Sequence, residues 1–390
     1  MFFFICLGLL AIIFFRAENK YETNGKKLLS YRYWLFCTVL TIFAAFRLVK
    51  ALGYGAIGGA DAPGYVQVFQ ICNDPTWQSW DWLQHHDIGF LYINRFIRLL
   101  FSDYHIYFFI VYGFIVCSYV LFLKELLIKK TNYIPCLLLI FLYWRSFCTL
   151  RSNLAIAFFL FGLVLLYRKK WWGWLPLFFS LLVHKFVLIY FGFIPFYLFF
   201  KNKKVKWNYL VIFVVAAAIL GSYARDFFLA RFAHIDLGGA YQSYARMNMG
   251  TSFFDNFWKI VFDQLALAVT IFILRNRIRE HINSIAESES AKLNIIYWMC
   301  IYDFMMIPVC FLMGVWRGYE FFYLPRIVMW CECLYVAIYN KQKYIRGIYN
   351  MFFLILFISW MVFRFYAMWK DSFLMPYIFE PLYLLSSDLQ

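Results

Sequence analysis

Charged side chains are scarce in this chain of 390 residues: Asp, Glu, Lys and Arg make up 15% of it, whereas 64% is hydrophobic and 24% is aromatic. A soluble protein of this length could not bury so much apolar surface. The apolar runs are continuous, which is typical of membrane helices and not of the alternating strands of a barrel. We therefore predict an all-α, polytopic integral membrane protein whose residues 1–390 form a single membrane domain.

Motifs for P-loop nucleotide binding, serine-hydrolase chemistry and metal chemistry are missing, since the sequence contains no Walker A, GxSxG, HExxH or DxD pattern. The ten cysteines include no C-x-x-C pair, and their placement predicts neither a zinc site nor a disulfide framework. His85, His86 and Asp87 carry metal-binding side chains, but adjacent residues rarely converge on one ion. We expect neither a metal nor a cofactor.

Hydrophobic runs predict about twelve transmembrane helices, several of them shorter than the roughly 20 residues that a perpendicular span needs. The first run lacks a basic region and a cleavage motif, so we expect a retained span and not a signal peptide. The predicted spans lie near residues 2–15, 33–50, 104–123, 133–150, 152–167, 171–184, 187–200, 207–223, 257–274, 295–315, 324–339 and 348–368.

The net charge of +16 is concentrated in turns between the spans, so we expect no nucleic-acid partner. Lysine and arginine are more than twice as frequent in one set of alternate turns as in the other, and the positive-inside rule places the richer set in the cytoplasm. Both termini are then expected on the outer side of the membrane. The cytoplasmic turns are 16–32, 124–132, 168–170, 201–206, 275–294 and 340–347.

The kind of basic residue also differs between the two sides. The cytoplasmic turns are rich in lysine, whereas the outer loops are rich in arginine, including Arg145, Arg151 and Arg317. Because lysine suffices for the positive-inside rule, the outer arginines need another reason, and bidentate binding of phosphate is one. The alternative is that they extend to lipid headgroups.

Two outer loops, 51–103 and 224–256, are candidates for substrate-binding or lid elements. The first begins with a Gly- and Ala-rich stretch that leads to Asp61 and Tyr65. Such a backbone permits tight turns and close approach to a ligand, or it simply ends a helix. Further along the same loop, the apolar stretch 88–102 has two arginines on one helical face, which predicts an amphipathic helix in the outer interface.

Charged residues also occur within the later predicted spans. Arg326 and Arg364 can pair with acidic residues inside the bundle, which is the commonest fate of such charges. The polar stretch 275–294 predicts a long cytoplasmic loop with no special role. The acidic residues of these spans are Asp263, Asp303 and Glu332.

Several of the polar residues follow one another in a recognisable order. An arginine in the second span precedes G-x-D-x-x-x-Y, an outer arginine with x-x-x-A opens a later span, a histidine closes the next one, and R-x-Y occurs late on the outer side. In order and sidedness this pattern resembles the EpsG/Wzy-like polysaccharide polymerases. It departs from them at Lys185, because the family commonly has a small hydroxyl residue soon after the histidine. The positions are Arg47, Gly59, Asp61, Tyr65, Arg151, Ala155, His184, Arg317 and Tyr319.

The resemblance implies an enzyme of the bacterial cytoplasmic (inner) membrane that extends an O-antigen or exopolysaccharide. Its donor and acceptor would be oligosaccharides linked to polyprenyl pyrophosphate, joined at the outer, periplasmic face by metal-independent glycosyl transfer. The lipid bilayer, and chain-length regulator or flippase proteins, are the further partners that it suggests.

The chemistry of such a transfer assigns roles to the candidate residues. Charge develops on the leaving phosphate, and preorganised cations stabilise it, so we place Arg151 and Arg317 on the pyrophosphate. A neutral imidazole accepts a proton from a hydroxyl group, which makes His184 the expected base and Asp61 the alternative base or a sugar-hydroxyl acceptor. The remaining candidates, which support the pyrophosphate or bind substrate, are Arg47, Tyr65, Arg145 and Tyr319.

Other classes of membrane protein remain open. A polyprenyl-linked glycan flippase or transporter would use the acidic residues of the late spans, but the halves of the sequence show no repeat. A GT-C glycosyltransferase normally has an acidic metal motif in its first outer loop, where only isolated aspartates occur here. An acyltransferase is a weaker third alternative. The sequence identifies neither the sugar nor the linkage.

Overall fold

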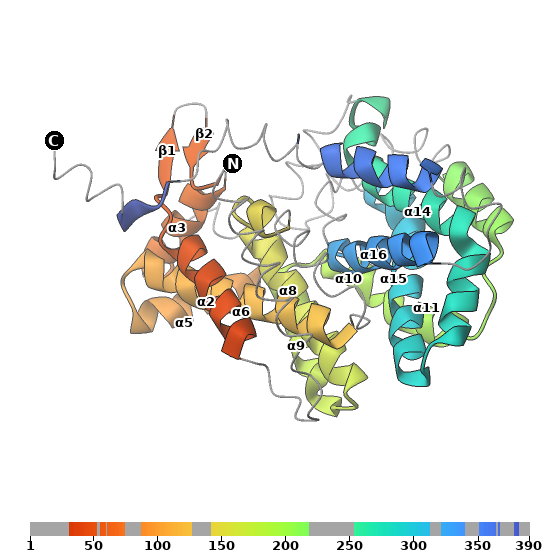
Figure 1. Cartoon of the computed structure of the whole chain (residues 1–390). Coiled ribbons are helices and arrows are strands. Elements are labelled where there is room, and N and C mark those ends of the chain that lie inside the picture. Colours follow the sequence, from red (N-terminus) through yellow and green to blue (C-terminus); the bar gives the residue numbers. More distant parts are fainter. Residues whose placement is uncertain are drawn as a thin grey trace. The chain divides into compact units, whose positions relative to one another are not determined.

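The computed structural model describes residues 31–52, 55–59, 61–74, 87–126, 142–217, 253–312, 321–339, 351–363, 366 and 378–381, and these are mostly helical (Figure 1). The chain divides into two compact units. The first consists of Met1–Glu125, Asn132–Val187 and Arg364–Gln390, and the second of Leu126–Thr131 and Leu188–Phe363.

The first unit carries most of the predicted site residues. Two of its helices, α6 and α8, are long and apolar enough to cross a membrane, and shorter apolar helices accompany them. The predicted spans overlap helices in the described residues, but the predicted span 33–50 is too long, since α2 ends at Ala45 and strand β1 begins at Lys50. The predicted span 2–15 lies outside the described residues. The elements are α2 (Tyr31–Ala45), β1 (Lys50–Leu52), β2 (Gly55–Ile57), α3 (Ala62–Ile71), α5 (Ile88–Leu100), α6 (Tyr104–Leu126), α8 (Leu150–Tyr167), η3 (Trp171–Gly173) and α9 (Trp174–Val183).

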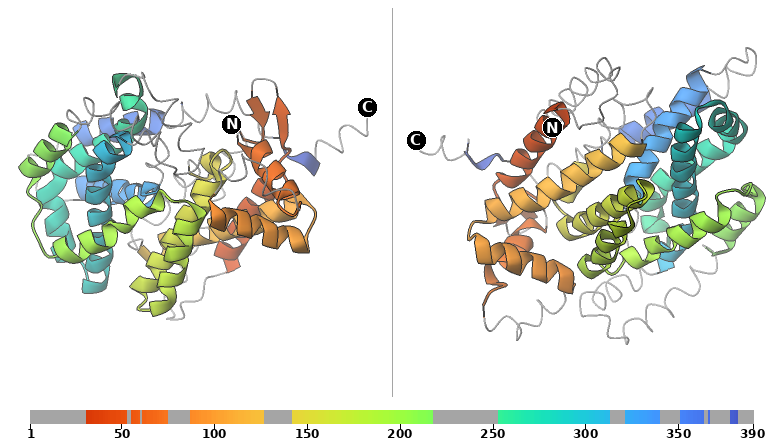
Figure 2. Two further views of the ribbon diagram at one scale, coloured as in Figure 1. Left: turned by 180° about the vertical axis from the view of Figure 1, so that it is seen from behind. Right: turned by 90° about the horizontal axis from the view of Figure 1, so that it is seen from below.

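Helices α8 and α9 form a tight antiparallel pair (Figure 2). Gly162 and Gly173 face each other, and a Cβ on either would lie 2.8 Å from the other's carbonyl oxygen, so only glycine permits this approach. The turn between the helices closes at Lys169, whose φ of 59° is left-handed, with the Lys170 amide bonded to the Leu165 carbonyl at 2.9 Å. The start of α8 and the end of α9 consequently lie at the same end of the pair.

A short hairpin interrupts the helices and corrects the all-α prediction. Strands β1 and β2 pair antiparallel, with Lys50 opposite Ile57. Gly58 and Gly59 follow with φ of 82° and 126°, values that residues with a side chain rarely adopt. The Gly- and Ala-rich stretch thus forms a hairpin and a sharp turn that lead into α3.

Helix α5 confirms the prediction of an amphipathic helix in the stretch 88–102, whereas its place in the outer interface stays a prediction. Its Phe90 and Asn94 are completely buried. Its opposite face exposes large apolar side chains, which in water would be unfavourable but which suit an interface with lipid. The exposed side chains are Ile88, Tyr92, Phe96 and Leu99, each between 57% and 70% accessible.

The second unit is a set of helices in which α14, α15 and α16 pack against one another and α11 packs against α15 (Figure 2). The prediction of a long loop at 275–294 is wrong, because α14 continues to Ser284 and α15 begins at Glu287. Both helices therefore extend beyond their apolar parts. The elements are α10 (Val187–Phe191), which begins at the boundary of the units, α11 (Phe193–Phe200), a helix at 207–217, α14 (Phe253–Ser284), α15 (Glu287–Leu312), α16 (Tyr323–Tyr339) and a helix at 351–363.

Buried charges of the second unit are paired, as expected for ionisable groups inside a bundle. The Arg326 Nε atom lies 3.4 Å from an Asp303 carboxylate oxygen, which confirms this predicted pair. Glu332 lies instead beside His281, with 3.6 Å between the carboxylate oxygen and Nε2. The side chains of Asp263 and Arg364 are outside what the structure describes.

Candidate functional site

Three charged or titratable side chains of the first unit meet in its interior. Asp87 occupies the N-cap position of α5, Arg151 belongs to the first turn of α8, and His184 directly follows α9. One Asp87 carboxylate oxygen lies 3.7 Å from an Arg151 guanidinium nitrogen and 4.0 Å from Nδ1 of His184. All three residues are buried, with at most 8% of each accessible. We refer to them as the Arg–Asp–His cluster.

The cluster depends on close packing between α5 and α9. Gly89 lies against Leu182, and a Cβ at position 89 would come within 2.7 Å of the Leu182 backbone carbon. A side chain there would push the start of α5 away from the end of α9. Gly89 therefore keeps Asp87 beside His184, although the two residues are far apart in the sequence.

The position of Arg151 is fixed by hydrogen bonds at the break between the preceding helical turn and α8. The Asn153 side-chain amide donates to the Thr149 carbonyl at 3.0 Å and to its hydroxyl at 2.8 Å, and the Tyr119 hydroxyl donates to the Asn153 side chain at 2.6 Å. The Thr149 hydroxyl in turn donates to the Arg145 carbonyl at 3.1 Å. Arg145, which is half-buried, thus belongs to the segment that orients the start of α8.

Arg47 is completely buried and is surrounded by aromatic rings. Its guanidinium carbon lies 4.3 Å from the ring centre of Phe108 and 4.5 Å from that of Phe147. Its nitrogens donate to the carbonyls of Gly58 and Ala44, the first at 2.7 Å, and to the Tyr112 hydroxyl. These contacts fasten the hairpin to the end of α2.

The C-terminal segment forms further backbone contacts beside Arg47. Arg47 and Phe379 form an antiparallel bridge, with the Leu48 amide donating to the Ile378 carbonyl at 2.8 Å and the Glu380 amide donating to the Phe46 carbonyl at 2.9 Å. The C-terminal residues 378–380 therefore support the backbone from which the Arg47 side chain extends.

Asp61 lies between the hairpin and α3, and Tyr65 lies in the first turn of α3. Gly59 packs directly on the Phe147 carbonyl, where a Cβ would collide with that oxygen. Asp61 occupies the N-cap position of α3 and is partly accessible, whereas Tyr65 is buried with its ring 5.8 Å from that of Phe90 on α5. The G-x-D segment is therefore attached to two elements of the site, the break before α8 and helix α5.

The structure thus brings together two of the predicted site residues, Arg151 and His184, and adds Asp87, which the sequence offered only as part of an improbable metal motif. The sequence feature that could have indicated Asp87 is its position at a helix start, two residues before Gly89. Arg317 and Tyr319 lie outside the described residues. In the part of the chain that the structure describes, no three His, Cys, Asp or Glu side chains gather as metal ligands, and metal independence stays a prediction.

Apolar helices around a buried Arg–Asp–His cluster at one end of a helix pair point to a helical membrane protein with a polar site near the ends of its helices. The sequence matches the EpsG family over residues 39–379, and the chain belongs to that family. The resemblance inferred from the spaced motifs is thereby confirmed. No curated protein and no solved structure matches the sequence. Family membership supports a general role as a polysaccharide polymerase of the glycosyltransferase type.

Proposed function

We propose that this protein joins oligosaccharide repeat units linked to polyprenyl pyrophosphate into a surface polysaccharide. The reaction is a metal-independent glycosyl transfer at the outer face of the bacterial cytoplasmic membrane, in a chain of about twelve spans with both termini outside. The observation that carries the proposal is the buried Arg–Asp–His cluster, in which Asp87 lies between Arg151 and His184. It supplies a cation for a leaving phosphate and a base for an attacking hydroxyl.

In the proposed step, His184 takes the proton from a hydroxyl of the acceptor sugar while that oxygen bonds to the anomeric carbon of the donor. The bond between this carbon and the pyrophosphate oxygen breaks, and polyprenyl pyrophosphate leaves with the electron pair. Arg151 stabilises the charge that develops on the leaving group. Asp87 orients both partners, since a carboxylate beside an imidazole and a guanidinium favours one arrangement of each.

The other candidate residues take supporting roles in this proposal. Arg47 is enclosed by aromatic rings and backbone carbonyls, which supports a role in holding the hairpin in place. In this proposal Asp61 binds a sugar hydroxyl or acts as the alternative base, and Tyr65 is a further substrate-binding residue. Arg317 and Tyr319 remain proposed binding residues on the strength of the family pattern.

A strain that lacks this chain tests the proposed function. Loss of long glycan chains with lipid-linked single repeat units accumulating on the outer leaflet is expected, because the polymerase acts after translocation. Gel analysis of the glycan ladder, combined with an assay for which leaflet holds the repeat units, distinguishes the possibilities. Units stranded on the inner leaflet would instead identify a flippase, and repeat units lacking one sugar would identify a GT-C glycosyltransferase.

The proposed topology predicts opposite labelling at two lysines. A cysteine at Lys185, next to His184, is expected to react with an impermeant thiol reagent in intact cells, whereas one at Lys203 is expected to react only after permeabilisation. The measurement is made in a background without other reactive thiols. The reverse pattern contradicts the outer location of the site.

Native Cys72, the one cysteine in the loop 51–103, is expected to stay silent in this assay. It is 2% accessible, and burial raises the pKa of its thiol to about 11, an effect that the Arg98 charge only partly offsets. Because the thiolate is the reactive form, Cys72 reacts slowly at neutral pH and faster only as the pH approaches that value.

A further inference from the structure

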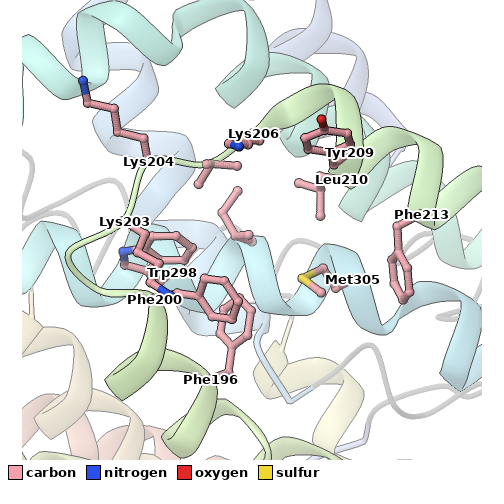
Figure 3. A pocket seen from close by; sticks show the side chains of 12 residues that line it. Phe196, Phe200, Lys203, Lys204, Lys206, Tyr209, Leu210, Phe213, Trp298 and Met305 are labelled. Carbon is pink, nitrogen blue, oxygen red and sulfur yellow. The ribbon is translucent and has the colours of Figure 1, made fainter.

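A pocket of about 560 Å³ lies within the second unit, between the end of α11, the turn 201–206, the helix at 207–217 and α15 (Figure 3). This volume falls within the range of about 300 to 1,000 Å³ that is usual for small-molecule sites. The pocket is formed by elements that are adjacent in the sequence or packed together, and the Asn294 side chain on α15 donates to the Lys201 carbonyl at 3.3 Å. It has no role in the proposed glycosyl transfer.

The wall of the pocket is almost entirely apolar. Phe196 and Phe200 come from α11, Trp298 and Met305 from α15, and Phe213 from the helix at 207–217. Several neighbouring side chains on the same helices are largely accessible, among them Phe199 at 64% and Ile212 at 63%. The pocket therefore opens on an apolar surface, as expected for a cavity that faces lipid tails.

The rim of the pocket carries positive charge. Lys203, Lys204 and Lys206 border it and are exposed. Figure 3 shows Lys203 and Lys206 at the edge of the pocket, whereas the Lys204 side chain extends outward from the turn. Lys203 is held over an aromatic ring, with its Nζ atom 3.5 Å from the ring centre of Phe199. Among the residues that the structure describes, no carboxylate forms an ion pair with these three lysines.

We propose that this pocket binds an anionic phospholipid, with an acyl chain against the aromatic wall and the phosphate of the headgroup on Lys203 and Lys206. An apolar cavity bordered by cations that pair with no carboxylate of the described residues matches an amphiphile with a negative head. The same lysines would satisfy the positive-inside rule without a pocket, but that rule does not require a cavity beneath them. The turn 201–206 is predicted to be cytoplasmic, so the bound lipid belongs to the inner leaflet and is separate from the glycan substrates.

Native mass spectrometry of the purified protein tests this proposal, with phosphatidylglycerol and phosphatidylcholine added in equal amounts after delipidation. The wild-type chain is expected to retain phosphatidylglycerol preferentially. In K203Q/K206Q the apparent affinity for phosphatidylglycerol is expected to fall about thirtyfold, which is the effect of two lysines at an anionic surface. The matched control is K169Q/K170Q, which removes two exposed lysines from another predicted cytoplasmic turn, and it is expected to bind as the wild type does.

A second variant separates the apolar wall from the charged rim. Met305→Trp fills part of the pocket while leaving every lysine in place, and it is expected to reduce retention of phosphatidylglycerol as well. Equal retention of the two lipids by the wild type would overturn the proposal, as would an equal loss in K203Q/K206Q and K169Q/K170Q. Unchanged retention in both K203Q/K206Q and Met305→Trp would also overturn it. Glycan polymerisation is measured separately, so its outcome does not decide this test.

Discussion

Long glycan chains are expected to disappear when His184 is replaced by glutamine, while lipid-linked single repeat units persist and the protein inserts at its normal level. Glutamine keeps a polar side chain of similar reach but has no basic nitrogen, so it cannot take the proton from the acceptor hydroxyl. A positioned general base contributes about 10² to 10⁴-fold to a rate, and a loss of that size reduces processive polymerisation to short products. The measurement is the glycan ladder of a complemented deletion strain, alongside immunoblotting of the membrane fraction.

The matched control for this variant is His281→Gln. His281 also lies beside a carboxylate, at 3.6 Å from Glu332, but in the second unit and in no proposed site. Its replacement is expected to leave the specific activity unchanged. Full activity of His184→Gln would sink the assignment of His184 as the base and would make Asp61 the next candidate, to be tested as Asp61→Asn.

The helices were largely predictable because apolar runs of membrane length have few alternatives to a helix. The error at 275–294 shows the limit of this reasoning, since a polar stretch marks where a helix leaves an apolar environment and not where it ends. The stretch contains neither glycine nor proline, so nothing in it stops α14 before Ser284. The hairpin at β1 and β2 escaped prediction because its strands have three residues each, too few for an alternating pattern.

The candidate site was predictable in part. The order and sidedness of the motifs indicated Arg151 and His184, but no local pattern shows that Asp87 lies between them. That contact depends on the packing of α5 against α9, which Gly89 permits. Arg47 illustrates the same limit. Its charge suggested that it binds substrate, whereas the structure surrounds it with aromatic rings and backbone carbonyls. Periodicity predicts which face of a helix is apolar, but it does not predict which distant element covers that face.

A second large loss of polymerisation rate is expected when Arg151, the cation of the Arg–Asp–His cluster, is replaced. Arg151→Lys keeps the positive charge but loses the planar, bidentate geometry with which a guanidinium binds phosphate. Removing one contact of this kind to a developing charge costs about 3 kcal/mol, or roughly a hundredfold in rate. Asp87→Asn preserves the shape of its side chain but removes the charge that lies beside both Arg151 and His184. We expect it to reduce the polymerisation rate by a comparable factor.

The double variant R151K/D87N separates a shared role from two independent roles. If Asp87 acts by orienting Arg151 and His184, its effect is partly lost once Arg151 is already changed, so the double variant should be less impaired than the product of the single effects.

Helix α8 offers a matched control at its opposite end, where the Arg168 guanidinium lies 2.6 Å from Glu125 and is 45% exposed. An exposed ion pair of this kind contributes at most about 1 kcal/mol, so R168K and E125Q are expected to polymerise like the wild type. The measurement is the initial rate of polymerisation of lipid-linked repeat units by each purified variant. Equal activity of R151K and R168K would show that Arg151 binds no pyrophosphate, and strictly multiplicative effects of R151K and D87N would show that Asp87 does not act through Arg151.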